Sequence, residues 1–268
     1  MLLIDWLHSF QHLEQIVFPA ECVWCECPVL FPQRVCSACQ KLLVHDYHRC
    51  RRCASPLPNV VPVEDCFRCR NSDWQLASVQ ALGPYRDDLR KAVILIKKRS
   101  YEPLRRSLAE LLAHRLLNSA EHWNHSEHPP VLMPVPNHWT RKFSGVAPTA
   151  NLLTQHLADL TGWPMVTGKV RRIRKTRKQG LLSWTERRKN VRGAFEIVGA
   201  KTQDRRHVLL VDDVLTSGST TNEIARVLKK GYALSVTAAV IARGTGARET
   251  QLKFSTDLDS SPDSLHNH

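Results

Sequence analysis

The stretch that decides the fold is Val208-Leu-Leu-Val-Asp-Asp-Val-Leu-Thr-Ser-Gly-Ser-Thr-Thr221. Its first four residues are apolar and predict a buried strand. Asp212 and Asp213 follow at the carboxyl end, where open α/β sheets place their ligands. A turn of small residues then leads into a helix predicted over 220–230. The turn consists of Thr216, Ser217, Gly218, Ser219 and Thr220.

This turn is suited to a phosphate group. Backbone N–H groups of the turn and the positive end of the helix would both face the anion, and the turn hydroxyls add donors. The carboxylates of Asp212 and Asp213 can accept hydrogen bonds from sugar hydroxyls, so a ribose 5-phosphate satisfies both halves of the stretch. The structural alternative is a plain strand, turn and helix with Asp and Ser as turn and cap residues. A Walker A loop is excluded because no Lys follows Gly218.

The stretch resembles the fingerprint with which type I phosphoribosyltransferases bind 5-phosphoribosyl-1-pyrophosphate (PRPP). The resemblance implies that Asp212 and Asp213 form the catalytic centre and hold the ribose hydroxyls. It implies that the turn from Thr216 to Thr220 binds the 5-phosphate, with Mg²⁺ accompanying the pyrophosphate. No residue is recognisable as the reader of a nucleobase, so the acceptor, and whether transfer occurs at all, stay open.

Apolar strands alternate with helices on both sides of this stretch. Such alternation predicts a parallel sheet flanked by helices, and therefore an α/β domain over 77–245. The resemblance of the Asp212–Thr220 stretch implies that this domain is of the type I phosphoribosyltransferase kind. The predicted strands are 77–85, 131–135, 207–213 and 234–241, and the predicted helices are 86–98, 102–119, 149–160 and 220–230.

Positive charge is concentrated in one segment of this domain. The chain has a formal net charge of +13, and eleven Lys or Arg stand between Lys169 and Arg192 against the single acid Glu186. Short strands are predicted on either side, at 170–174 and 194–198. Such density favours a polyanionic ligand over a merely solvated face.

Two interpretations of the basic segment stay open. As a mobile flap it would close over the departing pyrophosphate of PRPP; as a groove it would track the phosphates of single-stranded DNA. In the second case Trp184 and Phe195 would be available for stacking on bases, although core burial is the alternative for Phe195. The candidate flap residues are Arg171, Arg172, Lys175 and Arg187.

Eight of the nine cysteines form four C-x-x-C pairs before residue 70. Two such turns complete a tetrahedral zinc site, so four pairs predict two Zn²⁺ ions in a double zinc-ribbon module over 20–72. The simplest pairing joins the first pair to the second and the third to the fourth, although crossed pairing stays open. A disulfide framework would suit a secreted protein, and a thioredoxin-like motif needs one pair, not four. The predicted ligands are Cys22, Cys25, Cys36, Cys39, Cys50, Cys53, Cys66 and Cys69, with Cys27 left over.

The two ends of the chain differ from the rest. Residues 1–19 predict an amphipathic helix with neither a basic n-region nor a cleavage site, and no apolar run approaches the ~18 residues that span a bilayer. A cytoplasmic location without a membrane span is expected. Residues 249–268 are rich in Ser and Asp, and we expect them to be disordered.

With these motifs in view, the chain resembles the ComF competence family, and most closely its GntX (DNA utilisation) branch, over residues 18–243. After the proline-flanked strand, Arg141-Lys-Phe-Ser-Gly145 stands where the family carries an Arg-Gly-Phe-Asn-Gln-like run. The matching features are the cysteine pairs, Tyr85 before a helix ending in Ile96-Lys97, Pro134-Val-Pro136, Gln179-Gly-Leu181, Glu186-Arg187-Arg188, Asn190-Val-Arg-Gly-Ala-Phe195 and the PRPP-type turn.

The resemblance implies a cytoplasmic protein of DNA uptake, natural competence or growth on external DNA. Its expected partners are PRPP or ribose 5-phosphate, single-stranded DNA, and a helicase or the uptake machinery. Two alternatives stay open: a non-catalytic scaffold that binds single-stranded DNA, and a phosphoribosyltransferase of nucleotide salvage. A PRPP-sensing transcription regulator is disfavoured because no helix-turn-helix pattern precedes the domain.

Overall fold

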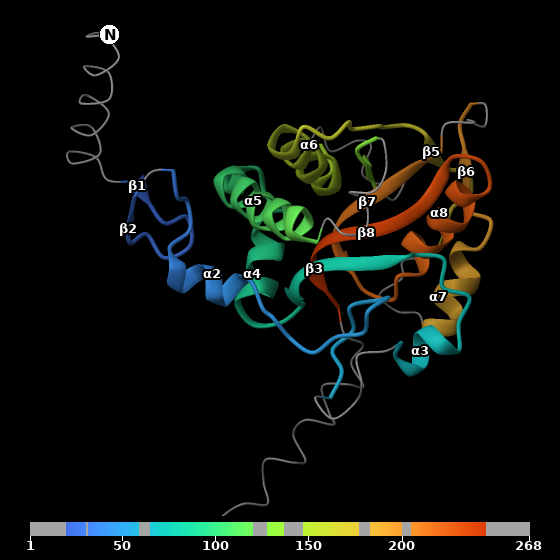
Figure 1. Cartoon of the computed structure of the whole chain (residues 1–268), viewed down its shortest axis with the longest axis horizontal. Coiled ribbons are helices and arrows are strands. Elements are labelled where there is room, and N and C mark those ends of the chain that lie inside the picture. The colour runs from blue at the N-terminus through green and yellow to red at the C-terminus, as the bar shows by residue number, and fades with distance from the viewer. Residues whose placement is uncertain are drawn as a thin grey trace, which may run out of the picture.

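The structure is a computed structural model that describes residues 20–30, 32–58, 65–119, 128–136, 147–176, 183–199 and 205–244. The helix predicted over 1–19 and the tail predicted over 249–268 lie outside these residues. A four-stranded, all-parallel sheet forms the centre of the molecule, with helices on both faces (Figure 1), so the predicted α/β class is confirmed. The strands, in spatial order, are β3 (Ser78–Pro84), β8 (Ala233–Arg243), β7 (Arg206–Leu215) and β4 (Val131–Pro134).

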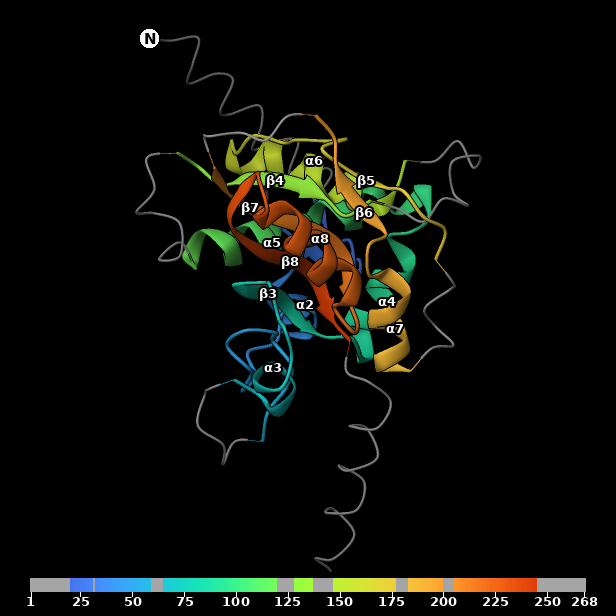
Figure 2. The same cartoon turned by 90° about the vertical axis from the view of Figure 1, so that its right-hand side faces the viewer.

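The pleat of β7 divides its apolar side chains between two cores. Leu209 and Val211 face the helices α4, α5 and α6, while Val208 and Leu210 face α8. Figure 2 looks onto the α8 face, where this helix crosses the central strands. Because every residue of β7 contacts one of the two layers, a continuous apolar run is favoured here. The helices are α4 (Asp87–Leu95), α5 (Glu102–Asn118), α6 (Thr149–Thr161) and α8 (Ser219–Lys229), with a short 3-10 turn η1 (Arg99–Tyr101) before α5.

The central strand is longer than predicted. It was expected to end at Asp213, but β7 runs on to Leu215, and Leu215 pairs with Arg243. The reason is that β8 also extends two residues beyond its predicted end and supplies backbone partners for the extra length. Asp212 and Asp213 therefore lie within a paired strand and not after it.

The basic segment lies beside the main sheet. Strands β5 (Val170–Arg172) and β6 (Phe195–Ile197) form an antiparallel pair of their own, and each is shorter than the predicted 170–174 and 194–198. Helix α7 (Trp184–Val191) stands between them in the chain. Its start is fixed by a capping box, in which the Ser183 hydroxyl accepts from the Glu186 N–H and the Glu186 carboxylate accepts from the Ser183 N–H.

The cysteine-rich part consists of two modules. The first cysteine module, residues 20–43, contains β1 (Ala20–Glu21), β2 (Pro28–Val29) and α2 (Ser37–Leu43), and it shares a core with α4 and α5. The second cysteine module, residues 50–70 with 59–64 undescribed, contains α3 (Phe67–Arg70). None of the helices formed by the described residues is long and apolar enough to span a bilayer.

Candidate functional site

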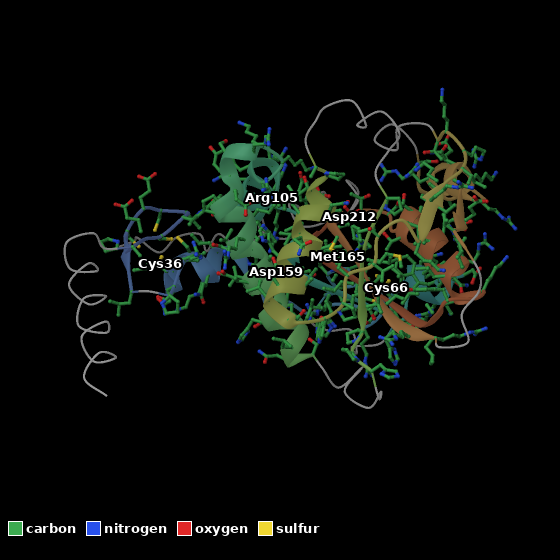
Figure 3. All side chains as sticks on the ribbon, turned by 90° about the horizontal axis from the view of Figure 1, so that it is seen from above. Cys36, Cys66, Arg105, Asp159, Met165 and Asp212 are labelled. Carbon is green, nitrogen blue, oxygen red and sulfur yellow. The ribbon has the colours of Figure 1, made fainter. Side chains whose placement is uncertain are left out.

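A cavity of about 230 Å³ opens at the carboxyl end of β7. It brings Asp212 together with all five residues of the predicted phosphate turn, and Arg172 of the basic segment reaches it from β5. Figure 3 shows Asp212 within the body of the α/β domain. The lining residues are Val135, Pro136, Arg172, Thr176, Asp212, Val214, Leu215, Thr216, Ser217, Gly218, Ser219, Thr220 and Thr221.

The phosphate turn, residues 216–220, is held in a conformation that needs glycine. Gly218 has a φ of 71° and caps the start of α8. A Cβ added there would lie 2.5 Å from Cη2 of Trp74, so the ring leaves no room for a side chain. Ser219 opens the helix and lines the cavity, and its buried hydroxyl has no hydrogen-bond partner among the described residues. A buried donor of this kind at a helix start is suited to an anionic oxygen.

Arg172 is a half-buried cation that lines the same cavity. Its guanidinium stacks 4.7 Å from the centre of the Phe195 ring, and Nη1 donates to Thr176 Oγ1 at 2.5 Å. Its buried Nε has no partner, and no carboxylate of the described residues forms an ion pair with this arginine. Burial lowers the pKa of Arg172. The cavity therefore contains a positive charge without a counter-ion.

The two adjacent acids have different surroundings. Asp212 lines the cavity, whereas Asp213 is bound by Lys97, which follows α4, with 3.0 Å between Nζ and Oδ2. Burial raises the pKa of Asp212 well above its usual range, and the negative charge of Asp213 raises it further. Perturbation by burial and a like charge inside a cleft is typical of functional sites.

The other candidate flap residues lie away from the cavity lining. Arg171 pairs with Glu196 across the β5–β6 ladder at 2.6 Å, and Lys175 is exposed. Arg187 lies half-buried on α7. Phe195 is only 3% exposed, so the stacking interpretation is wrong for this residue and the alternative of core burial holds. Residues 141–145 and 179–181, and the side chain of Trp184, lie outside the described part.

Several residues of the site were not predicted. Thr176 had no predicted role, and Lys97, Val135 and Pro136 matched only as parts of family motifs. A signal existed for the last two: β4 is a parallel neighbour of β7, so a motif at its carboxyl end arrives at the same edge of the sheet. Lys97 carries no comparable signal because its partner lies 116 positions further along the chain.

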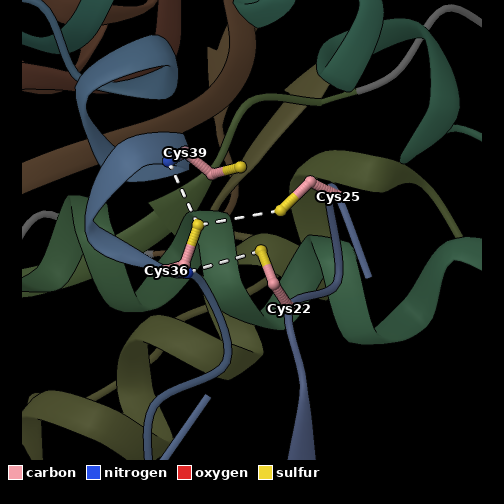
Figure 4. Close-up of side chains that lie close together, drawn as sticks. All are labelled: Cys22, Cys25, Cys36 and Cys39. Atoms are coloured by element: carbon pink, nitrogen blue, oxygen red, sulfur yellow. Dashed lines mark hydrogen bonds between the residues drawn. The ribbon is translucent and has the colours of Figure 1, made fainter. Parts of the chain in front are cut away.

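The eight paired cysteines form two groups of four, in which all sulfurs lie within 4.8 Å of one another. The grouping joins the first pair to the second and the third to the fourth. Figure 4 shows the sulfurs of the first group converging from two turns. The groups are Cys22, Cys25, Cys36 and Cys39, and Cys50, Cys53, Cys66 and Cys69.

The sulfur geometry fits a tetrahedral zinc ion. A Zn–S bond of ~2.3 Å requires sulfurs about 3.8 Å apart. The Sγ atoms of Cys25 and Cys36 lie 3.7 Å apart, and those of Cys53 and Cys66 lie 3.6 Å apart. Backbone N–H groups also point at sulfur, such as that of Cys66 at Cys50 Sγ, 3.3 Å away. Such donors stabilise thiolates.

Cys27 lies at the first group without belonging to it. Its Sγ is 3.3 Å from that of Cys25, and hydrogen bonding with the Cys25 and Cys36 side chains, which favours the protonated thiol, raises the pKa of Cys27 to about 12. In the second group, hydrogen bonds to Cys50, Cys53 and Cys66 hold the pKa of Cys69 far above its usual range. A cation shared by four thiolates removes this competition for protons, because metal binding displaces them.

Two family models match the two parts of this architecture. The phosphoribosyl transferase domain family matches residues 148–265, and the double zinc ribbon domain family matches residues 13–70. Among solved structures, a purine phosphoribosyltransferase from Pyrococcus horikoshii aligns with 52% of this chain and 83% of its own, at 14% identity and a TM-score of 0.31.

Two curated relatives match most of the chain. Competence protein F of Haemophilus influenzae is 30% identical over 197 residues, which cover 73% of this chain and 84% of the relative. DNA utilization protein YhgH of Salmonella typhimurium is 28% identical over 226 residues, which cover 82% of this chain and 96% of the relative. With a double zinc ribbon followed by a phosphoribosyltransferase-type α/β domain and with these relatives, the chain belongs to the ComF family of competence and DNA utilization proteins.

Proposed function

We propose that this chain binds PRPP or ribose 5-phosphate in the cavity at the end of β7. One observation supports this most directly: the cavity joins a carboxylate, a hydroxyl-rich helix start and an unpaired arginine, which are Asp212, the phosphate turn and Arg172. Each matches one part of a phosphorylated pentose. The carboxylate accepts from the sugar hydroxyls, and the turn and the arginine bind anionic oxygens.

The chain's own groups would act by positioning. The phosphate turn holds the 5-phosphate against the start of α8, and Asp212 holds the ring, so that the anomeric carbon has a fixed place. Asp212, with Asp213 beside it, would supply carboxylate oxygens for Mg²⁺, and the bound ion would neutralise pyrophosphate charge. Arg172 provides a preorganised positive charge in the partly desolvated lining of the cavity. Its electrostatic stabilisation of an anion is stronger there than in water. The acceptor of a ribosyl transfer is left open.

We further propose that the chain acts in the cytoplasm in the uptake or use of external DNA. The support is that its relatives are named for competence and for DNA utilization. A helicase or a component of the uptake machinery is the protein partner expected on the zinc-ribbon side.

Calorimetric titration tests the ligand. PRPP with Mg²⁺ and ribose 5-phosphate should each bind the full-length protein, and Asp212→Ala together with Asp213→Ala should abolish binding of PRPP. Undiminished binding by the double variant would reject the roles of the acids. Failure of the wild-type protein to bind either compound would reject the site.

A second function, binding of single-stranded DNA, is favoured by the exposed cations around β5 and α7. Arg174 donates to the carbonyls of Asn190 and Arg192, both at 2.9 Å, and so joins the two ends of this surface. Binding should weaken steeply with salt. Arg188→Ala with Lys189→Ala should reduce the salt dependence, and a salt-insensitive interaction would contradict this function. The exposed cations are Arg171, Arg174, Lys175, Arg188, Lys189 and Arg192.

A further inference from the structure

Arg243, the last residue of β8, is the largest fully buried side chain of the described residues, with 1% exposed. No carboxylate of the described residues neutralises it. Its guanidinium is satisfied by oxygens alone, which come from two separate parts of the chain. A buried charge is retained at such a place only if its hydrogen bonds are complete, so the oxygens around it are fixed in position.

On one side Arg243 binds the second cysteine module. Nε donates to the carbonyl of Cys53 at 2.6 Å, and Nη2 donates to Ser55 Oγ at 2.8 Å. Ser55 Oγ is in turn 3.3 Å from the sulfur of Cys53. The turn that carries a predicted zinc ligand is therefore held by the arginine directly and through one hydroxyl.

On the other side Arg243 binds the start of the phosphate turn. Nη1 donates to the carbonyls of Leu215 at 2.9 Å and Thr216 at 2.5 Å, and also to that of Gly244. Leu215 and Thr216 both line the ligand cavity. One side chain thus joins a zinc-ligand turn to the backbone from which the phosphate turn begins.

The segment that follows the second cysteine module makes a further connection. Asn222 of α8 accepts from the N–H of Gln75 at 2.6 Å and donates to the carbonyl of Asp73 at 3.0 Å. Between them lies Trp74, whose ring covers Gly218 and packs against the cysteine cluster of this module. The phosphate turn is therefore linked to the second module at two places, through Arg243 at its start and through Trp74 at Gly218.

The first cysteine module has different neighbours. Its Arg34 reaches Glu110 on α5 at 3.6 Å, and Leu43 packs in the core on the α4 side of the sheet. In Figure 3 its Cys36 lies at the far end of the molecule from Asp212. The two modules can be compared directly because each has one group of four converging cysteines. Among the described residues, only the second is joined to the phosphate turn, through Arg243 and Trp74.

We infer that the second cysteine module is a working part of the ligand site: metal bound by Cys50, Cys53, Cys66 and Cys69 holds the phosphate turn in its binding conformation through Arg243 and Trp74. Arg243 is a positioning residue, since it contacts no ligand itself. Metal fixes the Cys53–Ser55 turn because all four thiolates are committed to one ion. Without it the two oxygens that anchor Arg243 are free to move. The effect on ligand affinity rests on the proposed function; the effect on the turn does not.

The test compares Cys66→Ser with the matched control Cys36→Ser in the full-length protein. Zinc per chain is counted, amide hydrogen exchange is followed for peptides covering 215–222, and ribose 5-phosphate affinity is titrated. Each variant should lose one zinc. Only Cys66→Ser should lose protection at 215–222, and its affinity should fall roughly tenfold or more, as for supporting residues of other sites. Equal protection and affinity in the two variants would overturn the inference.

Two further variants that keep every zinc ligand control for the possibility that Cys66→Ser simply misfolds. Arg243→Lys keeps the charge and Ser55→Ala removes one hydroxyl, and both leave all thiols in place. Each should retain two zincs and the protection of β3, yet lose protection at 215–222, which a general loss of stability would not produce. Unchanged exchange at 215–222 in both would overturn the inference. If the wild-type protein binds no ribose 5-phosphate, the proposed function fails while the exchange result still decides the coupling.

Discussion

Lys97 and Asp213 form an ion pair across the edge of the sheet, with 3.0 Å between Nζ and Oδ2. Lys97 follows α4, which covers the opposite face from α8, so the pair joins that helix layer to the strand that carries the ligand site. The two neighbouring acids are thereby given separate tasks. Asp212 faces the cavity, and Asp213 is held beside it by a cation.

Replacing Lys97 by Met should affect the ligand more than the fold. The lysine is 39% exposed, so the loss of stability should stay below about 1 kcal/mol. Its positive charge lowers the pKa of Asp212, so its removal leaves more Asp212 protonated at neutral pH. Ribose 5-phosphate affinity should fall and should recover as pH rises. Lys91→Met, which breaks an exposed pair with Asp88 on α4, is the control and should leave affinity unchanged.

Asp212→Asn should stabilise the protein while impairing binding. Because the folded-state pKa of Asp212 is raised, its stabilising contribution is complete below the unfolded pKa of ~3.9 and is lost as pH rises through the folded pKa. The melting temperature of the variant should therefore exceed that of the wild type increasingly between pH 5 and 8, by about 2–4 °C per kcal/mol. A difference in melting temperature that does not depend on pH would argue against burial of the charge.

Arg172→Met should separate charge from packing. Methionine keeps an apolar stem against Phe195 and removes a cation without a counter-ion, so stability should not fall. Phosphate-bearing ligands should bind about 10–100-fold more weakly, the worth of a hydrogen bond between charged groups. Arg171→Met, which removes the neighbouring exposed cation paired with Glu196, should change little. Equal losses in both variants would assign the effect to net charge alone.

Gly218→Ala should destabilise the protein more than Gly162→Ala, although both glycines have nearly the same positive φ, 71° and 70°. Left-handed backbone costs an alanine about 1–2 kcal/mol at either position. Only at 218 does the new Cβ meet Trp74, at 2.5 Å, while the surroundings of 162 are open. Overpacking against the Trp74 ring should therefore destabilise Gly218→Ala by about 1–3 kcal/mol more than Gly162→Ala. Urea unfolding measures the loss of stability in both variants. Equal losses would show that the Trp74 ring moves aside without cost.

Zinc should leave the two modules in sequence. Cys25 of the first group is exposed and Cys36 half-buried, whereas three of the four cysteines of the second group are buried. A thiol-reactive mercurial with a chromogenic zinc indicator should release one zinc quickly and the second slowly, because attack requires access to a thiolate. The Cys36→Ser variant should lack the fast phase. Release in a single phase would contradict the difference in burial.

The sequence alone determined the local chemistry of this protein. Four apolar residues before Asp212, a turn of hydroxyls and glycine, and a following helix predict an anion site wherever they fold, because strand pairing and helix polarity are properties of the backbone. The C-x-x-C spacing likewise predicts metal ligands, because two residues are enough to turn one thiolate toward the other.

The tertiary structure decided which residues meet. Arg172 rather than Arg171 lines the cavity because β5 and β6 pair in one register, and the pleat then sends alternate side chains to opposite faces. The length of β7, the partnership of Lys97 with Asp213 and the position of Arg243 between Cys53 and Thr216 all join residues far apart in the chain. Sequence spacing cannot predict contacts between residues so far apart in the chain. Only the packed core brings their backbones within hydrogen-bonding distance.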